Sequence, residues 1–236
     1  MKLSKSENDF LKNYNIHDFD VPLTSVDLCI FSIIDQSLKV LLIKRSDYPF
    51  KDRWALPGGF VDIATDKNLD ATATRKLEQK TGVKTPYVEQ VETVGNSMRD
   101  PRGWSITVLY FALLALNNGK TGSQNTQWVS LKETEKSNLA FDHQVLLSKA
   151  IQRLRSKVSY TTLPMHILPK EFTLAELQKA YEIIMDRKVD KKSFRRRIDA
   201  ADLLIETGEL LQDGGRPAKL YRIRKGADTH FYNRSI

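Results

Sequence analysis

A helical stretch in the first third of the chain presents two cations and one amide on a single face. Lys76, Gln79 and Lys80 are spaced as i, i+3 and i+4, so their side chains share that face. Carboxylates at such positions would suit Mg²⁺, which prefers oxygen ligands. An ammonium group has no lone pair for a metal, and at ~4 Å it repels a divalent ion by roughly 2 kcal/mol even in bulk water. We therefore predict no metal site here, and Lys76 and Lys80 form either a solvated face or the counter-charge for an anionic ligand.

The helix that carries this face has recognisable ends, and β-rich runs surround it. Asn68 suits the N-cap position, and Gly82 suits the left-handed conformation that ends many helices. Between residues 21 and 131 lie short apolar runs typical of strands: VDLCIFSII, LKVLLIKR, VETVGNS, SITVLYFALLAL and QWVSL. A hairpin near residues 35–37 is expected to join the first two. A second helical pattern, AFDHQVLLSKAIQRLRSKV, follows these strands.

A second group of candidate ligand-binding residues lies in the segment SMRDPRGWS. Arg99 and Arg102 would supply guanidinium groups, which suit phosphate and ribose oxygens, and Trp104 offers a ring on which adenine could stack. The alternative is an ordinary surface turn with a structural Arg–Asp pair. Arg53 and Trp54, just before LPGG, are expected to line the same pocket.

The C-terminal third reads as a linker followed by helix, short turn, basic helix and hairpin. The prolines of SYTTLPMHILPKEF predict the linker, and Thr173 and Glu176 have capping-box spacing at the start of TLAELQKAYEIIM. The next helix is predicted over KKSFRRRIDAADLLIETG, with an apolar stripe of Phe194, Ile198, Ala201 and Ile205. The runs ELLQ and AKLYRIR flank DGGRP, where Gly214 and Gly215 suit a hairpin turn. This order of elements resembles the winged helix-turn-helix.

Most of the excess positive charge lies in this C-terminal part. Residues 151–236 hold 18 Lys and Arg against 11 Asp and Glu, whereas residues 1–150 hold 19 against 18. Such a surplus suits a polyanionic partner, although a basic surface that only serves solubility is the alternative. We predict DNA contacts from Lys191, Lys192, Arg195 and Arg196 of the basic helix and from Arg216 at the tip of the hairpin.

The stretch LPGGFVDIATDKNLDATATRKLEQKTGV resembles the Nudix box, the signature of hydrolases that split nucleoside diphosphates linked to another group. Its frame is present, with Arg75, Leu77, Gly82 and Val83 at the matching positions. The glutamate positions hold Lys76, Gln79 and Lys80, and the spacing from Gly59 to Arg75 is two residues longer than usual. The resemblance implies a diphosphate-binding pocket bordered by Gly58, Gly59, Lys76 and Lys80.

The whole chain resembles the Nudix-related transcriptional regulators of NAD metabolism in bacteria. The marks are LPGGF with the longer box, RDPRG, FTLAELQKAY, KSFRRRI and GRPAKLYRI. The resemblance implies an α+β chain: a Nudix α/β/α sandwich with a mixed sheet over residues 1–155, and a winged helix-turn-helix over residues 156–236. It also implies a homodimeric repressor of NAD biosynthesis or salvage genes on a palindromic DNA operator. Its implied effector is ADP-ribose, which releases the operator, and no other cofactor is expected.

Two other functions stay open on the sequence. The first is an active Nudix hydrolase that cleaves ADP-ribose to AMP and ribose 5-phosphate, since some members of the family are reported to retain this activity. It would need carboxylates from elsewhere, and Asp62, Asp66 and Asp70 precede the metal-binding turn. The second is a regulator of the same architecture that senses another sugar nucleotide. The segment LLSKAIQRLRSKV is a candidate for the dimer surface.

Other classes of site and location are disfavoured. The single cysteine, Cys29, lies in an apolar run and is expected to be buried, which excludes disulfides and structural zinc. The histidines are scattered without metal-ligand spacing: His17, His143, His166 and His230. No stretch has the ~18 or more apolar residues of a membrane span, and the N-terminus lacks the apolar core of a secretion signal. The sequence therefore predicts a cytoplasmic protein.

Overall fold

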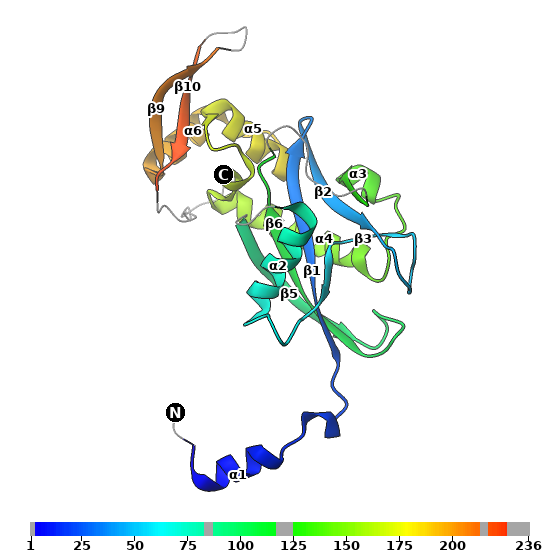
Figure 1. Cartoon of the computed structure of the whole chain (residues 1–236). Coiled ribbons are helices and arrows are strands. Elements are labelled where there is room, and N and C mark those ends of the chain that lie inside the picture. Colours follow the sequence, from blue (N-terminus) through cyan, green and yellow to red (C-terminus); the bar gives the residue numbers. More distant parts are fainter. Residues whose placement is uncertain (1–2, 83–86, 117–124, 213–216, 226–236) are drawn as a thin grey trace.

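A mixed sheet forms the centre of the molecule (Figure 1). The structure is a computed structural model that describes residues 3–82, 87–116, 125–212 and 217–225. The sheet has seven strands in the order β3-β2-β1-β6-β5, with β4 beside β1 and β7 beside β2. The strands are β1 (Leu23–Ile34), β2 (Ser37–Lys44), β3 (Trp54–Ala55), β4 (Gly58–Phe60), β5 (Tyr87–Asn96), β6 (Ser105–Leu113) and β7 (Thr126–Ser130). β1 and β6 are parallel, and the other pairs are antiparallel.

Helices cover both faces of this sheet, which explains why its central strands are mostly apolar on both faces. On one face, Val26, Leu28 and Ile30 of β1 pack with Ala73 and Leu77 of α2 (Leu69–Thr81). On the other face, Cys29 and Phe31 pack against α4 (His143–Tyr160) through its buried residues Leu146, Leu147, Ala150, Leu154 and Val158. Cys29 is buried, as predicted. The result is the three-layered α/β/α arrangement with a mixed sheet.

The predicted ends of α2 are confirmed. The side chain of Asn68 accepts a hydrogen bond from the backbone N–H of Ala71 at 2.8 Å, and Gly82 closes the helix in the left-handed region at φ 72°. The predicted hairpin is also present, with Asp35 and Gln36 at positive φ between β1 and β2. The sequence patterns missed the short strands β3 and β4, and the helices α1 (Lys5–Asn13), η1 (Ile16–Asp18) and α3 (Leu131–Thr134). Val83, the last position of the box, lies outside the described residues.

The prediction of a linker around Pro164 and Pro169 is wrong. α4 continues to Tyr160, and η2 (Leu163–Ile167) buries most of its side chains in the core that it shares with α5 (Leu174–Met185). The prolines end the α-helix because they lack a backbone N–H, but a 3₁₀ turn accepts them and the apolar residues between them pack. The boundary expected after residue 155 falls inside α4.

The C-terminal unit contains two helices and a three-stranded antiparallel sheet in the order β8-β10-β9. Its elements are β8 (Phe172–Thr173), α5, α6 (Lys191–Ala201), β9 (Leu204–Leu211) and β10 (Ala218–Ile223). The capping box of Thr173 and Glu176 is present. The second helix is shorter than predicted, because Asp202 ends it in the left-handed region at φ 49°. Ile205 therefore lies in β9 and not on the helix, and this strand begins before ELLQ.

Gly214, Gly215 and Arg216, predicted to form the tip of the hairpin, lie outside the described residues. Among the residues that are described, no helix is both long enough and apolar enough to cross a membrane.

Candidate functional site

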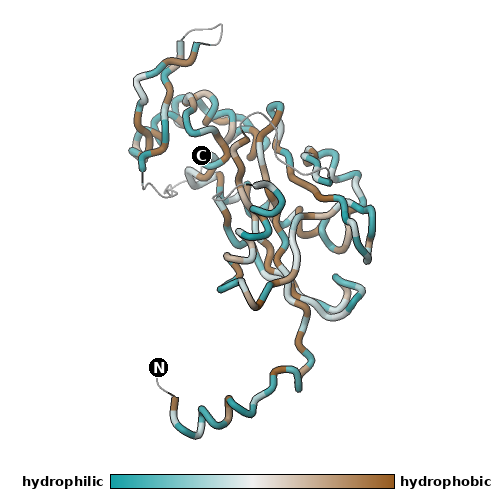
Figure 2. Tube along the Cα trace, in the orientation of Figure 1, coloured by the Kyte–Doolittle hydropathy of each residue, from teal (hydrophilic) through white to brown (hydrophobic). Residues whose placement is uncertain are grey.

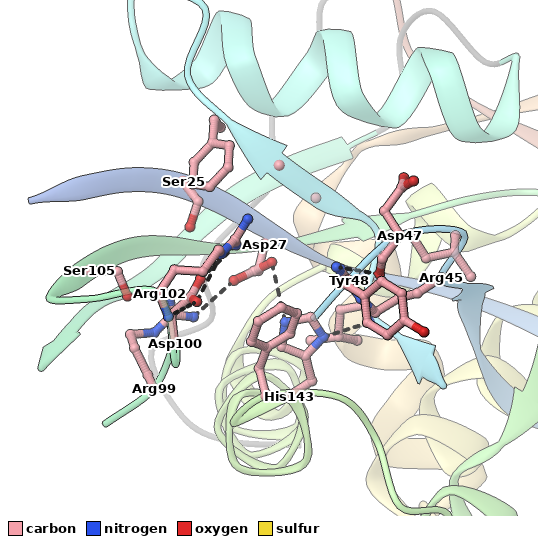
Figure 3. A pocket seen from close by; sticks show the side chains of 16 residues that line it. Ser25, Asp27, Arg45, Asp47, Tyr48, Arg99, Asp100, Arg102, Ser105 and His143 are labelled. Carbon is pink, nitrogen blue, oxygen red and sulfur yellow. Dashed lines mark hydrogen bonds and ion pairs between the residues drawn. The ribbon is translucent and has the colours of Figure 1, made fainter. Parts of the chain in front are cut away.

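A cavity of about 250 Å³ opens between β1, β4 and the N-terminal end of α4 (Figure 3). Arginines from the segment that joins β5 to β6 line one side, and residues that follow β2 line the other. The lining residues that carry the argument are Asp27, Arg45, Gly58, Gly59, Phe60, Arg99, Asp100, Arg102, Phe141 and His143. Of the predicted ligand-binding residues, the structure brings Gly58, Gly59, Arg99 and Arg102 together here.

The two glycines let the backbone of β4 pass close to its neighbours. A Cβ atom on Gly58 would lie 2.4 Å from the carbonyl oxygen of Val26 and 2.6 Å from Oδ1 of Asp27, so no side chain fits. Gly59 has a φ of 148°, which disfavours other residues, and a Cβ atom there would lie 2.9 Å from Nζ of Lys76. The side chain of Lys76 therefore lies directly against β4.

Arg99 is a buried structural arginine at one wall of the cavity. Its side chain is 5 % exposed, and its Nη2 lies 3.2 Å from Oδ2 of Asp27 and 3.1 Å from Oδ1 of Asp142. Its Nε also donates to Asp142 at 3.1 Å. These partners come from β1 and from the N-cap of α4, so Arg99 ties three separate segments together. Much of its hydrogen-bonding capacity is used within the protein.

Arg102, in contrast, is 41 % exposed at the mouth of the cavity. It forms a bidentate pair with Asp100, with Nη2 2.7 Å from Oδ2 and Nε 3.0 Å from Oδ1. The hydrogen bonds from Arg102 hold the pKa of Asp100 below its usual value. The guanidinium also lies over the ring of Phe60 at 5.0 Å. The exposed edge of Arg102 is free to meet an anion from solvent, as bidentate arginines do.

Arg45 and Phe141 were not predicted as site residues. The guanidinium of Arg45 lies 4.7 Å from the centre of the Phe141 ring, and its Nε donates to the carbonyl oxygen of Pro49 at 2.9 Å. Burial and then the nearby Arg102 lower the pKa of Arg45, and Asp100, Asp47 and Asp27 oppose this shift. The cavity lining carries as many carboxylates as guanidinium groups, and the guanidinium groups of Arg45 and Arg102 lie against the Phe141 ring. The available signal in the sequence was a cation directly after the apolar run of β2.

His143 and Asp27 form the polar floor. Nδ1 of His143 accepts a hydrogen bond from the backbone N–H of Leu56 at 2.9 Å, which assigns the ring proton to Nε2. Nε2 lies 3.6 Å from Oδ1 of Asp27. Burial lowers the pKa of His143, so the ring is neutral near pH 7. In the sequence this histidine was one of a scattered set, and only the fold places it under the cavity.

A second cavity, of about 240 Å³, shares Ile43, Arg45 and Asp47 with the first and contains Lys80 in its lining. Lys76 lies between the helix and Gly59, and burial followed by Arg75 lowers its pKa. The predicted cationic face of α2 therefore borders β4 through Lys76 and the second cavity through Lys80.

The aspartates that precede this face are already engaged. Asp66 accepts from Nε of Arg75 at 2.7 Å and from the hydroxyl of Thr72 at 2.8 Å, and the arginine keeps its pKa well below the usual range. Asp70 accepts from the hydroxyl of Tyr110 at 2.7 Å. Within the described ranges, no cluster of three or more His, Cys, Asp or Glu side chains is arranged to hold a metal ion.

Five predicted ligand-binding residues lie outside the lining of the first cavity: Arg53, Trp54, Lys76, Lys80 and Trp104. Trp54 pairs with Lys44 in the sheet and packs against the core, and the guanidinium of Arg53 lies 5.3 Å from the ring of Phe50. Trp104 is half exposed and packs beside Gly95. Proximity in sequence to the glycines and to Arg102 was a poor guide to these side chains.

The C-terminal unit presents the predicted basic surface. Phe194 and Ile198 of α6 are buried, while the cations on its other faces are exposed: Lys191, Lys192, Arg195 and Arg196. Lys191 and Arg195 also line a surface hollow together with Lys219 of β10 and the first residues of α5. This separation of apolar and cationic faces is the one that the sequence predicted.

Known proteins resemble both units. Residues 24–150 match the NUDIX domain, and residues 164–223 match the NrtR DNA-binding winged helix domain. The chain is 50% identical over 220 residues to "ADPR responsive transcriptional repressor NtrR" of Acinetobacter baylyi, which covers 92% of this chain and 88% of that protein.

Two solved structures of NrtR from Shewanella oneidensis are also similar. The complex with a 27mer DNA has a TM-score of 0.82 at 41% identity and covers 90% of this chain and 99% of that one. The complex of the NUDIX domain with ADP ribose has a TM-score of 0.58 at 43% identity and covers 64% and 99%. These matches confirm the predicted fold class and the family resemblance. The chain therefore belongs to the NrtR family, with a Nudix domain followed by an NrtR DNA-binding winged helix domain.

Proposed function

We propose that this protein is a transcriptional repressor whose Nudix cavity binds ADP-ribose and whose winged helix binds an operator. The relative from Acinetobacter baylyi is named as an ADP-ribose responsive repressor, and the two similar structures contain DNA or ADP-ribose. By this reasoning the protein represses NAD biosynthesis or salvage genes, binds a palindromic operator as a homodimer and releases it when ADP-ribose binds.

The observation that carries the proposal is the placement of guanidinium groups around the Phe141 ring in the cavity and of two lysines on the helix beside it. Arg45 and Arg102 surround the Phe141 ring, and Lys76 and Lys80 lie where a Nudix hydrolase would place metal-binding glutamates. Guanidinium and ammonium groups neutralise a diphosphate directly. The aromatic ring offers a surface for a base or a ribose. The site thus binds the nucleotide through the charges of its own side chains.

The same residues argue against hydrolysis of the bound nucleotide. Metal-assisted attack on a diphosphate needs carboxylates that hold the ion and activate water. Lys76, Gln79 and Lys80 supply none, and the nearby Asp66 and Asp70 are hydrogen-bonded to Arg75 and Tyr110. We infer that the nucleotide stays intact in the cavity and acts as a signal.

DNA binding falls to the exposed cations of α6. The second helix of a helix-turn-helix enters the major groove, and arginine is the commonest reader of guanine. Arg195 and Arg196 are therefore proposed to contact base edges or phosphates. Lys191 and Lys192, at the start of α6, are proposed to contact the phosphate backbone of the DNA. Arg216 is proposed to extend this surface from the hairpin.

α4 offers a route from the nucleotide to the DNA. Its N-terminal end carries Asp142 and His143 at the cavity, and further along Arg155 donates from Nε to the carbonyl oxygen of Ile184 in α5 at 3.1 Å. One rigid helix thus contacts both functional units. Ligand-dependent movement of its N-terminal end would be transmitted to the DNA-binding helices.

The test is a titration of operator DNA, selected from a random pool, with and without ADP-ribose. Because linkage is reciprocal, ADP-ribose should weaken DNA binding by the factor by which DNA weakens ADP-ribose binding, typically 5 to 150-fold. Lys76→Ala and Lys80→Ala should each lower ADP-ribose affinity. Equal DNA affinity with and without ADP-ribose would contradict the proposal, and unchanged affinity in both lysine variants would remove these residues from the site.

A further inference from the structure

A cavity of about 560 Å³ lies where η2 meets the start of β9 and the end of β10. We name it the junction cavity, with Met165, Leu168 and Pro169 on one wall and Ile205 and Ile223 on the other. Its volume lies within the ~300–1,000 Å³ that is usual for small-molecule sites. It shares no lining residue with the two cavities of the Nudix domain, so the proposed ADP-ribose site does not account for it.

The walls of the junction cavity are apolar. Leu168 and Ile223 are half-buried, and Ile205 lies directly opposite Arg222 in the ladder of β9 and β10. Leu204, the neighbour of Ile205, packs against the core. Because successive strand residues face opposite sides of a sheet, Ile205 projects from the face that turns away from that core. Apolar and hydrophilic positions lie next to one another along both strands (Figure 2), and Ile205 thus offers the cavity an apolar side chain that the core does not use.

Three cations border the same cavity: Lys170, Arg222 and Lys225. All three are exposed, and among the described residues none of them forms an ion pair and no carboxylate joins them in the lining. Arg224, in contrast, lies outside the lining and pairs with Asp202 at 2.8 Å. The junction cavity therefore combines apolar walls with positive charge that the described side chains do not neutralise.

Charge and shape together indicate the class of ligand. A phosphate monoester carries about −1.5 to −2 charges near pH 7, so it neutralises these cations better than a single carboxylate does. Arginine and lysine are also the usual partners of phosphate oxygens. The apolar walls suit a flat, weakly polar body and not a free inorganic ion. A mononucleotide combines both properties, because it joins a phosphate monoester to a base.

His166 connects the junction cavity to the Nudix domain. Its side chain lines the cavity, and its ring lies 4.8 Å from the ring of Tyr87 in β5. The hydroxyl of Tyr87 donates to Glu89 at 2.6 Å, and Glu89 forms an ion pair with Lys157 of α4. One wall of the cavity thus contacts the Nudix domain and the other belongs to the winged helix, so an occupant contacts both units.

We propose that the junction cavity is a second ligand site and that it binds a mononucleotide. The phosphate lies between Lys170 on one wall and Arg222 and Lys225 on the other, and the base packs on Leu168 and Ile205. This site is additional to the proposed ADP-ribose site, and binding there requires neither ADP-ribose nor DNA.

The first test is calorimetric titration of the whole chain with the 5′-monophosphates of adenosine, guanosine, cytidine and uridine. At least one should bind, and Arg222→Ala should weaken that binding about tenfold or more, the loss expected when a hydrogen bond between charged groups is removed. Lys170→Ala, on the other wall, should give a similar loss. Arg224→Ala is the matched control and should bind as the wild type does. Absence of binding by all four nucleotides, or wild-type affinity in both cavity variants, would overturn the proposal.

Two further titrations separate the phosphate from the base. Inorganic phosphate alone and the nucleoside alone should each bind at least about tenfold more weakly than the nucleotide. Inorganic phosphate that binds as tightly as the nucleotide would show that the cavity recognises charge alone, and a nucleoside that binds as tightly would exclude the three cations. Either result would overturn the proposal.

These titrations contain neither ADP-ribose nor DNA, which separates this proposal from the repressor function. A chain that binds no mononucleotide can still release its operator on binding ADP-ribose, and only the second ligand site is then removed. A chain that binds a mononucleotide in the junction cavity but binds no operator removes the repressor function alone.

The last test locates the nucleotide by methyl NMR of protein labelled at its isoleucines. Ile205 and Ile223 report on the junction cavity, and Ile43 reports on both cavities of the Nudix domain. The signals of Ile205 and Ile223 should shift when the nucleotide is added. A shift of Ile43 without a shift of Ile205 and Ile223 would place the nucleotide in the Nudix domain and overturn the proposal.

Discussion

Arg99 and Asp142 form an ion pair that fixes the N-cap of α4 to the wall of the cavity, with Nη2 of the arginine 3.1 Å from Oδ1 of the aspartate. The arginine is 5 % exposed, and the same Nη2 also lies 3.2 Å from Oδ2 of Asp27. The wall therefore depends on a buried charge network. Arg102, from the same segment, stands outside this network and is 41 % exposed.

These two arginines should respond differently to truncation. Arg99→Ala leaves the buried Asp27 and the partly buried Asp142 without their partner, so the free energy of unfolding should fall by about 3–5 kcal/mol. Arg102→Ala should change that free energy little but reduce ADP-ribose affinity, since its guanidinium is available at the mouth. Urea denaturation and calorimetric titration measure the two quantities. A loss of stability in both variants with no specific loss of affinity for Arg102→Ala would contradict the assignment.

Gly58→Ala tests the close approach of β4 to β1. The new Cβ atom would lie 2.4 Å from a backbone oxygen, so the strand must shift, and the free energy of unfolding should fall by about 1–3 kcal/mol together with ADP-ribose affinity. Gly103→Ala is the matched control: its φ of 150° is strained for alanine, but nothing lies within 4 Å of the new atom. Gly103→Ala should lose stability through its backbone alone and keep its ligand affinity. Equal ADP-ribose affinities in the two variants would argue against a role of Gly58 in shaping the cavity.

Arg155→Ala should weaken communication between the two sites. It removes the hydrogen bond to Ile184 in α5, whereas Arg153→Ala removes only an ion pair with Glu89 inside the Nudix domain. We expect Arg155→Ala to reduce the factor by which ADP-ribose lowers DNA affinity, while each affinity measured alone changes little. Arg153→Ala should leave the factor unchanged. If ADP-ribose lowers DNA affinity by the same factor in both variants, the hydrogen bond between Arg155 and Ile184 does not couple the two sites.

Stability should fall as the pH drops from about 7 to about 5. Burial lowers the pKa of His143, so near its unfolded value of about 6.5 the unfolded chain binds a proton that the folded chain does not. Stability from this group is complete above that pH and is lost below it. His166, whose pKa burial also lowers, contributes in the same direction. In urea denaturation, the free energy of unfolding of His143→Asn should therefore decrease less between the two pH values than that of the wild type. An equal decrease would exclude His143 as a cause of the pH dependence.

The salt dependence of DNA binding tests α6. Each phosphate contact contributes about 0.9 to the log-log slope of affinity against salt concentration. Arg196→Ala should weaken binding, and it should flatten the slope by about that amount if the residue contacts a phosphate, or relax sequence preference if it reads a base. Lys136→Ala, an exposed cation of the Nudix domain, should change neither. Wild-type affinity and specificity for Arg196→Ala would remove this helix from the interface.

The fold was largely readable from the sequence because its signals are local. β1 and β2 are apolar runs joined by a tight turn, α2 has a capping Asn68 and a terminal Gly82, and α5 has its capping box. Local sequence patterns fail to predict structure where packing between distant segments determines the conformation. The residues around Pro164 have the sequence pattern of a linker, and only the tertiary packing shows that they are buried in the core. The apolar stripe predicts that α6 continues to Ile205, but Asp202 ends the helix earlier.

The site was predicted only in part for the same reason. Gly58 and Arg102 belong to short motifs and were found, but Arg45, Phe141 and His143 reach the cavity from distant parts of the chain. Nothing in their immediate sequence indicates the contact. Trp54 and Trp104 are adjacent to the motifs and still point into other surroundings.

The most direct test of the central claim is to incubate the protein with ADP-ribose and Mg²⁺ or Mn²⁺ and to analyse the nucleotide by chromatography. Cations on the Nudix helix predict that ADP-ribose is recovered intact, with no AMP above a protein-free control. Accumulation of AMP and ribose 5-phosphate beyond the amount of protein would contradict this account and identify the chain as a hydrolase.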